Sequence, residues 1–261
     1  PPPPPRFFFF QLTRTTEILS GLVGSEMCIR DRGHVGIEDA AYRLNVHPMT
    51  IRRALKVLER DGRARLVRGG AVHVGSEEFA IRQSRALSAK KKMAEKLAPL
   101  LGEHETVGFD ASSTVHVLAQ NMPNVERLMV ITYGVEAFQS LQGKQNITTI
   151  LSGGERDSRT GSLVGLVAQQ TVSGFSIDCC ILSASAIDPE SGTMEPTMEE
   201  VEMKQSMAKA SQRVVVAVDA TKLSHRSSVR SFDLAQVDLL VTECDPRDPR
   251  LDPYRDIVDL R

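Results

Sequence analysis

The spacing of apolar residues divides the chain into two parts. Between residues 37 and 60, apolar positions recur at helical intervals in two segments, 37–44 and 48–60. From residue 90 onward, short apolar runs alternate with segments of helical period. Strands that alternate with helices predict a parallel sheet with right-handed crossovers. The pattern therefore predicts a small helical domain followed by a larger α/β domain.

The candidate ligand site of the larger domain lies where its strands end. In an open parallel sheet, ligands bind beyond the carboxyl ends of the strands. The residues that follow each strand are therefore the candidates for binding chemistry. The predicted strands are 105–110, 128–132, 146–151, 178–185, 213–219, 237–242 and 256–260, and the predicted helices are 90–101, 112–121, 134–142, 163–172 and 198–211.

Residues 45–70 have the pattern of a DNA-reading helix followed by a basic wing. Pro48 suits the first position of a helix, where a missing N–H costs nothing. Ile51, Leu55 and Leu58 then share one face, and the polar residues near the helix start are placed to meet bases and phosphates. An ordinary surface helix with a solvated arginine face is the alternative. The candidate DNA-binding residues are His47, Met49, Thr50, Arg52, Arg53, Lys56, Arg65 and Arg68.

The distribution of charge supports a DNA-reading segment. The 261-residue chain has a net charge of −1, so its overall charge gives no nucleic-acid signature. Residues 34–70, however, hold eight lysines and arginines against four acidic residues, a net charge of +4, whereas residues 71–261 carry −6. A basic N-terminal segment followed by an acidic remainder fits a DNA-binding domain joined to a domain with a different function.

The cysteines and the apolar runs indicate a protein of the reducing cytoplasm. The four cysteines have no metal-site or disulfide spacing. Cys179 and Cys180 lie in an apolar run, which favours a buried strand over a redox switch. No apolar run is long enough to cross a bilayer. We expect no metal, no cofactor and no membrane partner.

The segment TIRRALKVLERDGRARLVRGGA, residues 50–71, closely resembles the DeoR family of bacterial transcriptional repressors. The family usually has Ser or Thr at the position of His47 and Asp at that of Ala54. His47 can still accept a hydrogen bond at the helix start, although it is a poorer cap than serine. Phe79, Arg82 and Lys90 match the family pattern that leads into the effector domain. The resemblance implies a winged helix-turn-helix followed by a sensor domain similar to ribose-5-phosphate isomerase.

Residues 1–32 do not resemble either domain. PPPPPRFFFF is a homopolymer start, and GLVGSEMCIRDR resembles the conceptual translation of a sequencing adapter. We expect a non-native artefact that has replaced the first helix of the DNA reader; a genuine N-terminal tail is the alternative. The expected domains are then a winged helix-turn-helix at 33–75, a linker at 76–89 and an effector-sensing α/β domain at 90–261.

The segment after the first predicted strand of the sensor has the chemical groups that bind an anion. Asp110 ends the strand, and three hydroxyl residues at 112–114 open the next helix, where free N–H groups favour an anion. The family usually has D-x-G-T-T here, with glycine at the position of Ser112. A plain serine N-cap is the alternative for that residue.

Three further segments match the family pattern of the sensor. Glycines in the L-x-G-G match let a backbone approach a ligand closely, and a tight turn is the alternative. The Glu200–Lys204 spacing also fits a surface ion pair. Ser183 and Ser185 stand where the family commonly has glycine, so their loop is not a candidate. The candidate effector-binding residues are Asp110, Ser112, Ser113, Thr114, Gly153, Gly154, Glu200, Lys204, Asp219 and Lys222.

The sequence therefore predicts a DNA-binding transcriptional repressor of carbohydrate metabolism. The resemblance implies a phosphorylated sugar or related metabolite as effector, double-stranded operator DNA as partner, and a dimer or tetramer. A sugar-phosphate isomerase is the alternative, with Asp110, Asp219 or Lys222 transferring the proton, but the basic reader has no role in it. A third possibility is an interaction module that does not bind DNA.

Overall fold

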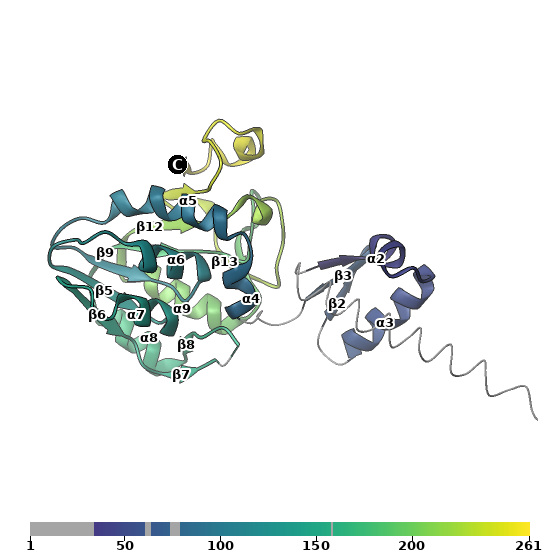
Figure 1. Cartoon of the computed structure of the whole chain (residues 1–261), viewed down its shortest axis with the longest axis horizontal. Helices are drawn as coiled ribbons and strands as arrows, with labels where there is room; N and C mark the ends of the chain where they lie inside the picture. Colours follow the sequence, from purple (N-terminus) through teal and green to yellow (C-terminus); the bar gives the residue numbers. More distant parts are fainter. Residues whose placement is uncertain (1–33, 61–63, 74–78, 158) are drawn as a thin grey trace, which may run out of the picture. The chain divides into compact units, whose positions relative to one another are not determined.

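The computed structural model describes residues 34–60, 64–73, 79–157 and 159–261. The chain forms two compact units, residues 1–77 and 78–261, drawn in Figure 1. Each unit has a hydrophobic core of its own. The predicted artefact at residues 1–32 lies outside the described residues and stays a prediction.

The N-terminal unit is a winged helix-turn-helix, as predicted. Its elements are β1 (His34–Gly36), α2 (Ile37–Leu44), α3 (Pro48–Arg60), β2 (Ala64–Val67) and β3 (Gly70–His73). The strands form an antiparallel sheet in the order β1-β3-β2. Asn45 ends α2 in the left-handed conformation, with φ of 51°, and so makes the turn between the helices. The core is closed by apolar residues of both helices and of all three strands.

The second unit is built on a seven-stranded parallel sheet, which confirms the predicted α/β architecture. The strand order is β15-β14-β12-β9-β4-β5-β6. The strands are β4 (Thr106–Phe109), β5 (Leu128–Thr132), β6 (Ile147–Leu151), β9 (Ile177–Leu182), β12 (Ser211–Ala217), β14 (Leu239–Val241) and β15 (Asp259–Leu260).

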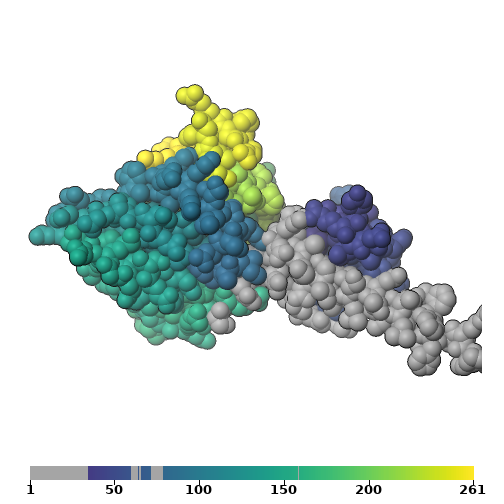
Figure 2. Space-filling model, in the orientation of Figure 1, coloured from purple at the N-terminus to yellow at the C-terminus, as the bar shows by residue number. Residues whose placement is uncertain are grey.

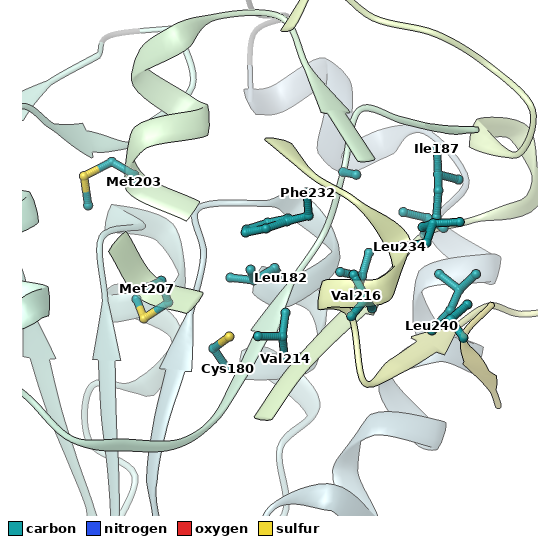
Figure 3. Close-up of a cluster of buried hydrophobic side chains, with 14 of the residues drawn as sticks. Cys180, Leu182, Ile187, Met203, Met207, Val214, Val216, Phe232, Leu234 and Leu240 are labelled. Atoms are coloured by element: carbon teal, nitrogen blue, oxygen red, sulfur yellow. The ribbon is translucent and has the colours of Figure 1, made fainter. Parts of the chain in front are cut away.

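Helices cover both faces of this sheet, so the strands are apolar on both sides. Cys179 and Ile181 of β9 belong to one core, and Cys180 and Leu182 to the other. Burial raises the pKa of the two thiols to about 11 and about 12, which fits core residues and not reactive cysteines. Helices α5 (Leu87–Leu97), α6 (Ser113–Asn121) and α7 (Val135–Leu141) pack on the first core, and α8 (Leu166–Ser173) and α9 (Met198–Lys209) pack on the second, part of which Figure 3 shows.

Helix α5 also contacts the C-terminal segment. Lys96 Nζ donates to the carbonyl oxygen of Cys244 at 2.6 Å. Figures 1 and 2 show α5 (blue) beside the last residues of the chain (yellow). Among the described residues, no helix is both long enough and apolar enough to span a membrane.

Several elements differ from the predicted ones. The helix predicted at 163–172 is wrong at its start, because 163–164 form a strand and Gly165, with φ of 88°, breaks the helical conformation before Leu166. The expected linker contains a short helix, α4 (Phe79–Ser84). The sequence also did not predict β7 (Glu155–Arg156) with β8 (Leu163–Val164), or the antiparallel sheet of β10 (Ala186–Asp188), β11 (Gly192–Glu195) and β13 (Val229–Phe232).

Candidate DNA interface and effector site

Helix α3 presents an apolar face to the core and a basic face to the surface. Ile51 and Leu55 are fully buried. On the other side Arg52, Arg53 and Lys56 are exposed. Met49 is 46% exposed and Thr50 is partly exposed. The candidate residues on the helix are therefore on the surface, where they are available to DNA.

His47 caps α3 with its imidazole ring. The backbone N–H of Met49 donates to Nδ1 of His47 at 3.2 Å. This bond satisfies one of the N–H groups that a helix start leaves without a partner. The predicted role of His47 as a substitute for the usual Ser or Thr cap is thus confirmed, and its exposed ring stays at the helix end where DNA contacts are expected.

The wing is attached to α3 through Glu59. The backbone N–H of Leu66 in β2 donates to Oε1 of Glu59 at 2.9 Å. Arg68 is exposed in the turn of the wing, whereas the side chain of Arg65 lies outside the described residues. Gly70 is required at its position, because a Cβ atom there would lie 2.0 Å from the carbonyl oxygen of Val35. The wing therefore has a fixed backbone with Arg68 at its tip.

The strand order of the sensor reverses between β4 and β9. From β4 the chain continues to β5 and β6 on one side, and it then returns to place β9 on the other side of β4. The crevice beyond the carboxyl ends of two such strands is the usual ligand site of an open α/β sheet. Asp110 follows β4 and Ser183 follows β9, so both lie at this switch point.

Ser183 connects four of the predicted effector-binding residues. Its backbone N–H donates to Oδ2 of Asp110 at 2.7 Å, and its carbonyl oxygen accepts from Nζ of Lys204. Its hydroxyl lies 3.4 Å from Thr114 Oγ1 and 3.4 Å from Lys222 Nζ. The structure thus brings Asp110, Thr114, Lys204 and Lys222 together. Ser183 was not among the predicted residues, because its position is usually glycine in the family.

Lys204 is a buried cation held by two buried carboxylates. Its Nζ atom lies 2.8 Å from Glu195 Oε1 and 3.2 Å from Asp110 Oδ2. Burial alone disfavours the charged amine, but Glu195 and Asp110 outweigh this effect and raise the pKa of Lys204 above its ordinary value. Glu195, on β11, was missed because the sequence did not predict that strand. The two carboxylates therefore favour the charged form of Lys204, which lies beside Asp110 at the switch point.

The alternative of a surface Glu200–Lys204 ion pair is wrong. Both side chains are buried, at 8% and 4% exposure. Glu200 instead accepts a hydrogen bond from Ser162 Oγ at 2.5 Å. Burial raises the pKa of Glu200 above its usual range, although Lys204 opposes this effect. The spacing of four residues was right for a shared helix face, but that face points into the protein.

Lys222 and Asp219 lie at the end of β12. Lys222 Nζ donates to the carbonyl oxygen of Ala184 at 2.6 Å. Burial lowers the pKa of Lys222, although Asp219 opposes this effect. Asp219 Oδ1 accepts the backbone N–H of Thr221 at 3.1 Å. Lys222 thus lies near Asp219, and its ammonium group donates a hydrogen bond to the neutral carbonyl group of Ala184.

The hydroxyl residues at 112–114 differ in their roles. Ser112 is an N-cap, because its Oγ atom accepts the backbone N–H of Val115 at 3.1 Å, which is the alternative considered for it. Ser113 Oγ donates to the carbonyl oxygen of Arg82 in α4 at 3.2 Å. Lys90 Nζ also donates to that carbonyl oxygen. The sequence showed Arg82 and Lys90 as family matches without placing them at the site.

Gly153 and Gly154 follow β6 with φ of 71° and 106°. A Cβ atom on Gly154 would lie 2.6 Å from the carbonyl oxygen of Val164 and 2.9 Å from Cβ of Ala168. Gly154 is therefore required by contact with its own chain. At Gly153 only the positive φ calls for glycine, because a Cβ atom there would have no neighbour within 4 Å among the described residues.

The N-terminal unit has an exposed basic recognition helix with a wing, and the second unit has a parallel sheet with a polar switch point. Together these features define a transcription regulator with separate DNA-binding and sensor domains. The chain belongs to the DeoR family. Residues 26–77 match the DeoR-like helix-turn-helix domain, and residues 85–244 match the DeoR C terminal sensor domain. The first match begins within the segment that the sequence predicts to be foreign.

The relatives of this chain are named as regulators. It is 33% identical to the HTH-type transcriptional regulator GolR of Listeria innocua, over 77% of this chain and 80% of that protein. It is 27% identical to the glycerol-3-phosphate regulon repressor of Escherichia coli, over 84% and 88%. It is 26% identical to the L-fucose operon activator of Haemophilus influenzae, over 82% and 88%. These names support the predicted regulator and not the isomerase alternative.

Solved structures include distant matches to this chain. A D-ribose-5-phosphate isomerase in complex with phospho-erythronic acid matches with a TM-score of 0.39 and 13% identity, over 51% of this chain and 52% of that chain.

Proposed function

We propose that this protein represses an operon of carbohydrate metabolism and that a phosphorylated sugar or related phosphate ester, bound at the carboxyl edge of the sensor sheet, changes its operator affinity. The observation that supports this site most directly is the hydrogen bond between Asp110 and Ser183 across the switch point, with Lys204 and Lys222 beside it. A ligand changes DNA affinity only by its different affinities for the two states of the protein.

The groups at this edge suit the two ends of a sugar phosphate. Lys222 offers a compact cation to a phosphate group. Asp219 can accept a hydrogen bond from a sugar hydroxyl, whereas Asp110 is fully buried and both of its carboxylate oxygens already accept backbone N–H groups. One relative is named a glycerol-3-phosphate regulon repressor, and this name, which contains a phosphate ester, supports the same class of ligand.

The DNA-binding role implies a symmetric assembly. We propose a dimer or tetramer in the cytoplasm that reads paired half-sites, since most oligomers are symmetric and helix-turn-helix dimers read half-sites one helical turn apart. We also propose 33–75 as the reader, 76–89 as the linker and 90–261 as the sensor.

The Arg53→Ala variant is expected to lose operator affinity. The loss should be about 1–3 kcal/mol if Arg53 reads a base, or a decrease of about 1 in the salt slope if it holds a phosphate. The measurement is a gel shift on the promoter of the native gene at low and high salt, with Arg52→Ala and Lys56→Ala in parallel. Lys209→Ala, which removes an exposed charge from α9 of the sensor, is the control. Unchanged affinity in all three helix variants would refute the interface.

Phosphorylated sugars are expected to stabilise the sensor, and their unphosphorylated parents are not. A ligand at about 100 times its Kd stabilises the native state by roughly 2.7 kcal/mol, which is visible as a thermal shift. The Lys222→Ala variant should keep its fold and lose most of the response. Equal shifts from sugar and sugar phosphate, or a full response in the variant, would show that the phosphate binds elsewhere. Formation of ketose from ribose 5-phosphate would favour the isomerase alternative.

A further inference from the structure

Three cations, Arg82, Lys90 and Lys222, gather beside the switch point. Lys90 Nζ donates to the carbonyl oxygen of Arg82, and Lys222 Nζ lies 3.4 Å from Ser183 Oγ at the switch point. Besides burial, the charge of Arg82 lowers the pKa of both lysines. Within the described part of the chain, no carboxylate lies within 4 Å of any of the three cations, in contrast to Lys204. Burial and the charge of Lys222 lower the pKa of Lys90 to about 8. Such a cluster favours the binding of an anion.

Within the described part of the chain, the guanidinium of Arg82 has a buried N–H group without an acceptor. Its Nη2 atom donates to the carbonyl oxygen of Thr160 at 2.8 Å, and its Cζ atom lies 5.3 Å from the ring centroid of Phe79. Its Nε atom is buried and has no hydrogen-bond partner among the residues that the structure describes. Buried donors are nearly always paired with protein, water or ligand, so this one calls for an acceptor. Arginine presents its donors as a fork that matches phosphate oxygens.

Arg82 belongs to α4, the first helix after the DNA-binding unit ends at residue 77. Helix α4 has no buried residue, and both polar contacts and an edge-to-face contact between the rings of Phe79 and His116, with 5.3 Å between centroids, hold it to the rest of the C-terminal unit. The backbone N–H of Phe79 donates to the carbonyl oxygen of Arg159 at 2.8 Å, and Gln83 Nε2 lies 3.1 Å from His116 Nε2. Three further hydrogen bonds use Arg82 itself, with Thr160, Ser113 and Lys90. The position of α4 therefore depends on the groups that surround the cation cluster.

We propose that Arg82 is a ligand-contacting residue, and that a phosphate group shared by Arg82, Lys90 and Lys222 clamps α4 onto the sensor. Because α4 directly follows the DNA-binding unit in the chain, the clamp carries the effect of the ligand toward the reader. This proposal rests on the proposed function, since it takes the phosphate ester as the effector.

The first test measures ligand affinity in the full-length chain by calorimetry, with inorganic phosphate and glycerol 3-phosphate as the probes. The Arg82→Gln variant should bind both about tenfold more weakly or worse, because charge-assisted hydrogen bonds are lost. Arg82→Lys keeps the charge without the fork and should fall between this variant and the wild type. Lys91→Gln removes an exposed charge from the adjacent helix α5 and should bind as the wild type does.

The second test measures amide hydrogen exchange of residues 79–85 with and without phosphate. Amide exchange of residues 79–85 should slow when phosphate binds to the wild type, and it should change less in the Arg82→Lys variant. The Arg82→Lys measurement tests the proposal even if the Arg82→Gln variant does not fold. Wild-type phosphate affinity in Arg82→Gln, or phosphate binding that leaves exchange in 79–85 unchanged, would overturn the clamp and leave the proposed function standing. A wild-type protein that binds no phosphate ester would overturn both.

Discussion

Replacing Lys204 with methionine is expected to destabilise the sensor by about 3–5 kcal/mol, because two buried carboxylates would lose their cation. Lys204 is 4% exposed, and it contacts Asp110 and Glu195 at 3.2 and 2.8 Å. Methionine has nearly the same length, so the loss comes from charge and hydrogen bonding more than from packing. Urea unfolding of the full chain, followed by a probe in the sensor, measures the effect.

The matched control is Lys209→Met on the same helix. Lys209 is exposed, and its replacement should change stability by less than about 0.5 kcal/mol. Adding Glu195→Gln to Lys204→Met should restore part of the loss, because one of the two uncompensated charges is then removed. A loss in Lys204→Met as small as that of the control would mean that the buried ion network contributes nothing to the stability of the sensor.

The parallel sheet was predictable because its strands are buried on both faces. Runs such as residues 179–182 are apolar without alternation, which in a chain that also has helical segments indicates parallel strands. Helix α4 was not predictable in the same way. Its six residues bury no side chain, so they show no helical periodicity, and its position comes from contacts with residues distant in the sequence, Arg159, Thr160 and His116.

The site was predicted in part for a related reason. The carboxyl ends of parallel strands lie at one edge of the sheet. Because Asp110 and Lys222 both follow strands, the sequence correctly predicted that they lie near each other. Sequence spacing does not say which partner a charged residue meets in space. The spacing of Glu200 and Lys204 therefore also fitted a surface ion pair, whereas the partners of Lys204 are Asp110, which follows β4, and Glu195 in β11. Arg82 matched the family pattern, but nothing in its neighbouring sequence indicated that α4 folds against the sheet edge.

Helix α3 depends on a small core, so the Leu55→Ala variant is expected to lose DNA binding altogether. Leu55 is fully buried in the core of the N-terminal unit. Its truncation costs about 2–5 kcal/mol, and a domain below about 70–80 residues rarely has more than about 3–5 kcal/mol of stability. The variant should therefore show no gel shift on the promoter of the native gene. Because the sensor is a separate unit with its own cores, the thermal response to phosphate esters should stay as in the wild type.

Leu118→Ala is the matched control, since Leu118 is equally buried but lies in α6 of the sensor. The same chemical change should leave DNA binding intact at low temperature and lower the melting temperature of the sensor, because a larger core tolerates the loss without unfolding. The two variants should thus give opposite patterns in the two assays. Loss of ligand response in Leu55→Ala, with its DNA binding retained, would contradict the independence of the two cores on which this prediction depends.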